Sequence, residues 1–149
     1  MNLLPLSPIV TRLKTPNLCP SFRLFGTAAD LTAAAKARTP AKLAAYVVLL
    51  GAEGHDVREG SGPLRQDFDV QVSVLLRQVL SGLDGAAGLK QLETPAGEIR
   101  AALFGWQHPD ADLRFTIASE GLEDFDPTTG VTLYRIDFQT RVRLMEPLT

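Results

Sequence analysis

Side chains that could perform chemistry are few in this sequence, and they are dispersed. A metal centre needs several histidine, cysteine or carboxylate ligands that converge. The chain has two histidines and one cysteine, His55, His108 and Cys19, without ligand spacing. We therefore expect no metal site. A single cysteine cannot form an internal disulfide, which fits synthesis in the reducing cytoplasm.

The most reactive combination lies in a glycine-rich stretch, where His55 is followed by Asp56. A carboxylate that orients an imidazole can create a general base, but a solvated loop histidine is the commoner outcome. Ser61 stands between Gly60 and Gly62. It lacks the G-x-S-x-G pattern between a strand and a helix that exposes a nucleophile. No catalytic residue is predicted.

Two patterns resemble ligand-binding loops only in part. Segment 82–90 is rich in glycine, but Leu89 separates Gly88 from Lys90 where a phosphate-binding loop requires G-K-[ST]. The acidic stretch 110–126 lacks the spacing and the glycine of a calcium loop. We interpret it as solvated surface and expect no cofactor.

Composition indicates an ordinary globular protein. The 149 residues suit a single domain, 1–149, with 45% hydrophobic and 21% charged residues. The net charge of -2 disfavours nucleic-acid binding, which needs a concentrated basic surface. The longest apolar run, Leu43–Leu50, is too short to span a membrane, and the N-terminus has no basic region before its apolar residues. We therefore expect neither a membrane span nor an export signal.

Apolar spacing in the first third predicts two helices around one strand. Ser7 is placed as the N-cap of a short helix with Pro8 at its first position, and the apolar face consists of Leu6, Ile9, Val10 and Leu13. A strand is expected over Ser21–Gly26. Thr27 then caps an alanine-rich helix that runs to about Arg38.

The middle of the chain predicts two core strands joined by a long connection. Ala45–Leu50 is an aliphatic run suited to a buried strand, and from Gln66 the sequence QDFDVQVSV alternates between apolar and polar residues. Between these strands, Gly51–Arg65 contains several glycines. Because glycine favours a flexible backbone, a long mobile loop is expected there.

The last third predicts a helix and a long hairpin. Apolar residues from Leu89 to Leu103 indicate a helix, with Pro95 marking its second part and Gly105 ending it. Strands follow over Leu113–Ser119 and Val131–Met145, joined through the turn in DFDPTTG. The fold class is therefore α+β: one mainly antiparallel sheet with helices packed on one face and a long C-terminal hairpin.

In this order the elements resemble the tail terminator family of tailed bacteriophages over nearly the whole chain. The matching pieces are the TAADLTAAA segment, the AAYVVLLG strand, QDFDVQVSVLL and the closing hairpin with Tyr134, Asp137 and Phe138. The most specific local piece is IRAALFGW, with the A-L-x-G-W ending at Ala102–Trp106. Trp106 itself is more often a packed residue at a helix end than an anchor for a partner.

The resemblance implies a non-enzymatic virion protein at the head-proximal end of the tail, assembled in the host cytoplasm. Such a protein forms a hexameric ring on the tail tube protein, stops tube polymerisation and provides the surface for head–tail joining to a connector protein. The alternatives are another head–tail connector or tail-tube component and, from a different class, a small hydrolase or nucleotide-binding enzyme. No membrane partner and no direct nucleic-acid readout are implied.

A ring of identical subunits needs two unlike, complementary surfaces on each copy. We expect the basic segment with Lys36, Arg38 and Lys42 to face the acidic stretch of a neighbouring copy. We expect the loop between the core strands to contact the tube. The acidic candidates are Glu120, Glu123, Asp124 and Asp126, and the loop candidates are Glu53, His55, Arg58 and Arg65.

Overall fold

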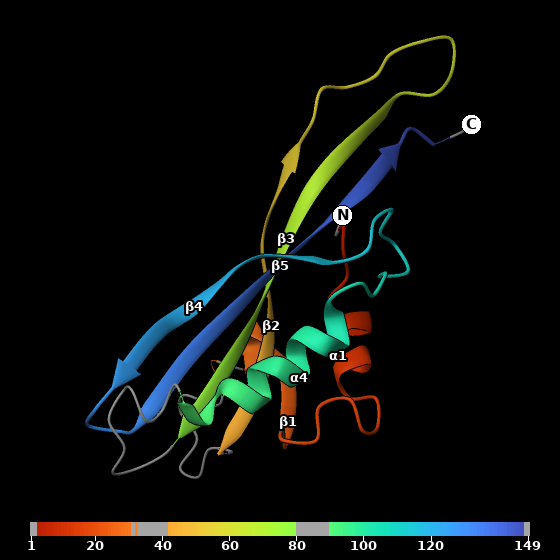
Figure 1. Cartoon of the computed structure of the whole chain (residues 1–149). Helices are drawn as coiled ribbons and strands as arrows, with labels where there is room; N and C mark the ends of the chain where they lie inside the picture. The colour runs from red at the N-terminus through yellow and green to blue at the C-terminus, as the bar shows by residue number, and fades with distance from the viewer. Residues whose placement is uncertain (1–2, 31, 33–41, 80–89, 148–149) are drawn as a thin grey trace.

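The fold is a five-stranded sheet with helices beside it. The computed structural model describes residues 3–30, 32, 42–79 and 90–147. The strands are β1 (Leu24–Thr27), β2 (Leu43–Gly54), β3 (Arg65–Val79), β4 (Thr116–Asp126) and β5 (Val131–Met145), in the order β1-β2-β3-β5-β4 (Figure 1). β1 and β2 are parallel, and every other neighbouring pair is antiparallel. The α+β class is confirmed, with a mixed sheet.

Two helices, α1 (Ser7–Leu13) and α4 (Glu93–Leu103), build the main core with the sheet. They lie together beside the lower half of the sheet in Figure 1. Their buried residues join alternate strand residues in one cluster that includes Ile9, Leu13, Ile99, Leu103, Val72, Val74, Ile136 and Phe138. Burial is not confined to this face, because Tyr46 and Ser73, which point to the opposite face, are also buried.

The ends of both helices follow from backbone hydrogen bonds. α1 begins at Ser7 with Leu6 as its N-cap, so the predicted cap is one residue too late. The reason is that the Leu6 carbonyl already accepts hydrogen bonds from the N–H groups of Ile9 and Val10. α4 ends at Leu103, and Gly105 follows with φ of +80°. Glycine tolerates this left-handed conformation, which confirms the predicted helix end.

The β2–β3 hairpin extends well beyond the predicted strands. β2 continues to Gly54, and its last residues pair with Phe68–Gln71 of β3 across a bulge after Leu49. The predicted loop over Gly51–Arg65 is therefore wrong in extent, because backbone pairing with β3 holds residues 51–54 in spite of their glycines. We call the projecting end of the sheet, residues 51–69 and 139–147, the arm; it is at the top of Figure 1.

The two outer strands also differ from prediction. β1 begins at Leu24, not at Ser21, because Arg23 is the first residue whose N–H bonds to β2. β4 spans Thr116–Asp126, well past the predicted end at Ser119. An edge strand exposed to water needs no apolar alternation, so the acidic half of β4 gave no strand signal. Residues 28–30 and 32 are helical, and the other residues of the predicted alanine-rich helix beyond Thr27 lie outside the described residues.

Trp106 closes one end of the core. Its indole lies 5.7 Å from the Phe115 ring and 5.9 Å from the His108 ring, centroid to centroid. His108 is buried, and its Nε2 lies 2.7 Å from the Pro5 carbonyl oxygen. These contacts confirm that Trp106 is a packed residue past the end of α4, and they tie the N-terminal segment to that end.

Candidate functional site

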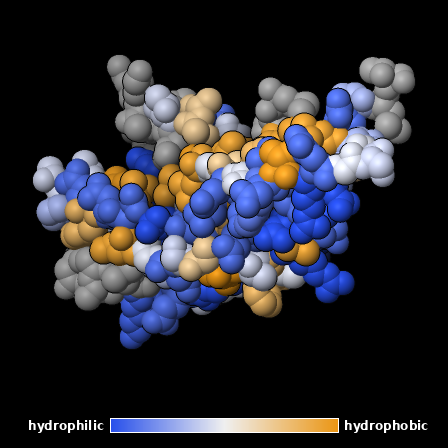
Figure 2. Space-filling view, turned by 90° about the horizontal axis from the view of Figure 1, so that it is seen from above, coloured by the Kyte–Doolittle hydropathy of each residue, from blue (hydrophilic) through white to orange (hydrophobic). Residues whose placement is uncertain are grey.

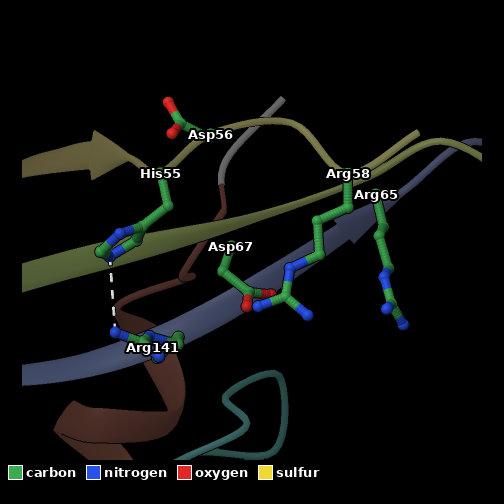
Figure 3. A pocket seen from close by; sticks show the side chains of 6 residues that line it. All are labelled: His55, Asp56, Arg58, Arg65, Asp67 and Arg141. Atoms are coloured by element: carbon green, nitrogen blue, oxygen red, sulfur yellow. Dashed lines mark hydrogen bonds between the residues drawn. The ribbon is translucent and has the colours of Figure 1, made fainter.

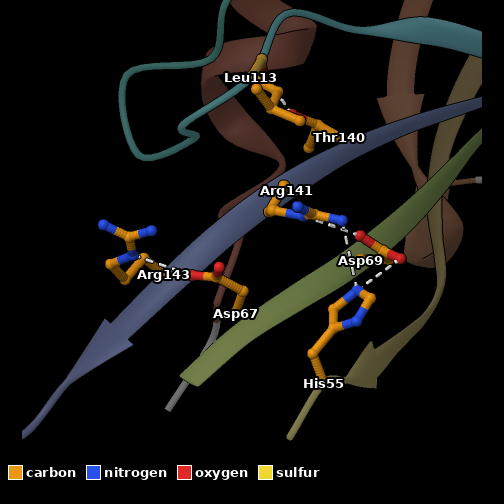
Figure 4. Close-up of polar contacts among 7 residues, drawn as sticks. All are labelled: His55, Asp67, Asp69, Leu113, Thr140, Arg141 and Arg143. Carbon is orange, nitrogen blue, oxygen red and sulfur yellow. Dashed lines mark hydrogen bonds and ion pairs between the residues drawn. The ribbon is translucent and has the colours of Figure 1, made fainter. Parts of the chain in front are cut away.

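One face of the arm carries paired charges in register across β3 and β5. Asp67 faces Arg143 and Asp69 faces Arg141 in the antiparallel pairing. The Arg143 Nε–Asp67 Oδ1 distance is 2.9 Å, and the Arg141 Nε–Asp69 Oδ1 distance is 3.1 Å (Figure 4). The residues of each strand alternate between faces, so these four side chains emerge on the side opposite the main core.

His55 joins this series from the end of β2. Its Nε2 lies 2.8 Å from Asp69 Oδ2, and Arg141 Nη2 lies 3.4 Å from the same nitrogen. Nε2 donates to the carboxylate only in the tautomer that protonates it, and it then has no lone pair for Arg141. The carboxylate that orients His55 is thus Asp69 of β3, and not the adjacent Asp56.

Both carboxylates are held in their ionised form. The hydrogen bond from His55, followed by that from Arg141, holds the pKa of Asp69 below its ordinary value of 3.8. The hydrogen bond from Arg143 is the main reason that the pKa of Asp67 is also lowered. In both cases a donor favours the charged carboxylate more than partial desolvation opposes it.

A hollow of about 370 Å³ lies on this face of the arm. Figure 3 shows the side chains that line it: His55, Asp56, Arg58, Arg65, Asp67 and Arg141. The lining combines three guanidinium groups with two carboxylates, a set of groups that suits charged side chains of a partner. None of these lining residues is a serine, threonine, cysteine or lysine that could act as a nucleophile.

An apolar groove lies beside this hollow at the tip of the arm. It has a volume of about 340 Å³, and its apolar lining includes Val57, Leu64, Leu144 and Met145. Three of these side chains are exposed: Val57, Leu64 and Met145. Seen from above, hydrophobic patches lie among hydrophilic residues (Figure 2). Exposed apolar side chains beside charges are typical of surfaces that bind other proteins.

The predicted acidic stretch forms the far edge of the sheet, in β4. Glu120 pairs with Arg100 of α4 at 2.9 Å, and Glu123 pairs with Arg135 of β5 at 3.1 Å. Asp124 and Asp126 accept backbone hydrogen bonds from Phe125 and Thr128, and neither forms an ion pair with a described residue. The negative charge of this edge that no described cation neutralises therefore lies at the C-terminal end of β4, on Asp124 and Asp126.

The predicted basic segment is described only at its last residue. Lys36 and Arg38 lie outside the described residues, whereas Lys42 is exposed directly before β2. Of the loop candidates, Glu53 is in β2, Arg65 begins β3, and His55 and Arg58 lie between them. The structure brings His55, Arg58 and Arg65 together around one hollow, and it places the acidic candidates in a different strand.

Sequence reasoning missed the partners that complete the arm, namely Asp67, Asp69, Arg141 and Arg143. Their alternation with apolar residues indicated that they share a face of their strands. What was missing was the register: Asp69 and Arg141 are 72 residues apart, and only the pairing of β3 with β5 joins them. Opposite charges on two alternating strands were the available signal.

Within the described part of the chain, no cluster of three or more histidine, cysteine, aspartate or glutamate residues is arranged to hold a metal ion. No helix of the described residues is long and apolar enough to cross a membrane.

Comparison of the chain with known protein families identifies its family. A family model described as phage tail terminator protein matches residues 1–147. The chain belongs to this family. No curated protein matches the chain. The family is one of structural proteins of phage tails and is not a known enzyme family, so the chain is a virion component.

Proposed function

We propose that this tail terminator forms a hexameric ring at the head-proximal end of the tail tube, where it stops tube polymerisation and presents the surface to which the head connector joins. The observation that carries the proposal is the family match over residues 1–147. We propose that each subunit of the ring is a single domain, residues 1–149.

The arrangement of the molecule supports an assembly role. The arm projects from one end of the sheet and combines a charged hollow with an apolar groove. The acidic edge of β4 is a second surface of different chemistry. Two unlike surfaces allow one subunit to bind two different neighbours, the tube protein through the arm and another copy of the chain through β4.

Which residues make these contacts remains a prediction from the sequence. The arm residues Glu53, His55, Arg58 and Arg65 are proposed to contact the tail tube protein. The acidic residues of β4 are proposed to face the basic segment of a neighbouring copy. The exposed position of Lys42 and the projection of the arm are compatible with both contacts.

The proposal is tested by deleting the gene from its phage and measuring tail lengths by electron microscopy. Loss of a terminator leaves tube growth unchecked, so headless tails of abnormal and variable length are expected. Restoration of normal length by the gene in trans is the control. Normal tails joined to heads in the deletion lysate contradict the proposal. Absence of any tube instead favours the alternative function of a tube component.

A further inference from the structure

The two edges of the sheet carry opposite charges. On one side, Arg23 precedes the edge strand β1 and Lys42 precedes its neighbour β2. Both side chains are exposed, and neither has an ion-pair partner among the described residues. At the other edge, β4 contains four acidic residues and no basic one. Asp124 and Asp126 are the two that no described cation pairs.

The charged parts of the two edges lie at the same level along the strands. Arg23 donates its N–H to the Leu43 carbonyl, and from Leu43 the row of paired residues runs through Gln78 and Thr132 to Phe125. Phe125 stands between Asp124 and Asp126 in β4. The row that starts at Leu24 crosses the sheet in the same way and ends at Asp124.

Each edge also exposes one leucine close to its charges. Leu24 of β1 is 43% exposed, and Leu122 of β4 is 45% exposed. The row of paired residues that ends at Leu122 begins at Phe25, the neighbour of Leu24. Phe25, which begins that row, packs against the main core, so Leu122 lies on the core face of the sheet and Leu24 lies on the opposite face.

From this complementarity we infer that the β1 edge of one copy docks against the β4 edge of a second copy of this chain. The inference rests on the proposed ring and names its subunit contact. A heterologous contact gives a closed ring only when one copy is related to the next by rotation without a rise along the axis. Because the basic and the acidic patch lie at the same level along the strands, a rotation about an axis parallel to the strands can bring them together without a rise.

Side chains, and not a continuous sheet, make this contact. The pairing of β4 with β5 is interrupted twice, between Ile117 and Ser119 and between Leu122 and Asp124. Bulges twist an edge and disrupt its free row of N–H and C=O groups, so they oppose the addition of a further strand. Ion pairs of Arg23 and Lys42 with Asp124 and Asp126 then define the interface.

Cysteine cross-linking on assembled tails tests this contact directly. Arg23→Cys and Asp124→Cys are introduced together in a Cys19→Ser background, and the variant is supplied to the gene-deletion phage. Four strand spacings of about 4.8 Å separate the two positions within one chain, about 19 Å in total. An ion pair of a long arginine side chain holds the two Cα atoms farther apart than the limit of about 7 Å that a disulfide allows, so a short bis-maleimide cross-linker is used. Because this cross-linker is shorter than the distance within one chain, any link joins different copies.

We expect covalently linked oligomers of increasing size when purified tails are treated with this cross-linker. The matched control replaces Asp124→Cys with Asp110→Cys, an exposed acidic position outside β4, and should give no such series. Tails of normal length without cross-links overturn the edge contact while leaving the capping function intact. Normal tails in the deletion lysate itself overturn the function, so the two failures are distinguishable.

Charge reversal provides the second test. Arg23→Glu with Lys42→Glu should lengthen the tails, and so should Asp124→Lys with Asp126→Asn, in which the asparagine still accepts the turn hydrogen bond of Asp126. Combining the four substitutions should return tail length part of the way toward normal, because the one cation introduced at position 124 then faces the two introduced glutamates. The surface control Arg114→Glu should leave length unchanged. Normal capping by both reversed variants contradicts the inference.

Discussion

The ion pair between Arg141 and Asp69 should contribute little to folding, although it is the centre of the charged face of the arm. The two side chains are 39% and 47% exposed, and their closest charged atoms are 3.1 Å apart. In water, two unit charges about 4 Å apart attract by about 1 kcal/mol. Ordering both side chains offsets part of this, which leaves about 0.2–1 kcal/mol for an exposed pair.

A double-mutant cycle of Arg141→Gln and Asp69→Asn, followed by urea unfolding, measures this coupling. We expect a coupling free energy below about 1 kcal/mol. The reference is Ile136→Ala in the core, which should cost about 2–5 kcal/mol because it removes buried methyl groups and leaves a cavity. A coupling of about 3 kcal/mol or more refutes the reasoning, because it requires a pair shielded from water.

The pH dependence of the coupling gives an independent check. The pKa of Asp69 is lowered in the folded state, chiefly by His55 and then by Arg141. A lowered folded-state pKa means that the stabilisation is present above the ordinary value of 3.8 and is lost as the pH falls through the folded-state pKa. The coupling should therefore be constant near pH 7 and fade below about pH 4. A coupling that persists at pH 2 contradicts the assignment to this carboxylate.

Three further predictions concern the fold. Burial, followed by the charge of Glu98, raises the pKa of Cys19 from 9.0 to about 11, so its contribution to stability is full below pH 9 and is lost as the pH rises through 11. The free energy of unfolding should therefore fall by about 3 kcal/mol as the pH rises through this range. In the Cys19→Ala variant this fall should be absent, as measured by urea titrations between pH 8 and 11. Gly105→Ala should destabilise by about 1–2 kcal/mol, measured by thermal unfolding, because φ there is +80°. His108→Ala should cost about 1–3 kcal/mol in the same assay, since His108 is buried and the part-buried Asp110 N–H and Pro5 carbonyl oxygen lose their partner.

The parts of the fold that sequence reasoning predicted are those in which local chemistry decides the structure. Alternation over Phe68–Val74 fixed the face of β3, and Gly105 marked the end of α4 because few other residues tolerate its backbone. Both signals are confined to a few neighbouring residues, so no knowledge of the tertiary structure was needed to interpret them.

The elements that were predicted poorly depend on distant partners. Residues 51–54 are rich in glycine, yet they form a strand because Phe68–Gln71 supplies backbone partners. The acidic half of β4 is extended because β5 pairs with it, and no apolar periodicity is required at an exposed edge. The charged face of the arm likewise needed the register of β3 against β5, which no single segment of sequence contains.

The position and copy number of the protein on tails test the central claim most directly. The chain carrying a C-terminal tag is supplied to the gene-deletion phage, and purified tails are labelled against the tag, imaged by electron microscopy and quantified by protein content. The account predicts label at the head-proximal end alone and six copies per tail, one hexameric ring. Label along the tube, or a copy number that grows with tail length, would contradict the account and identify a tube component instead.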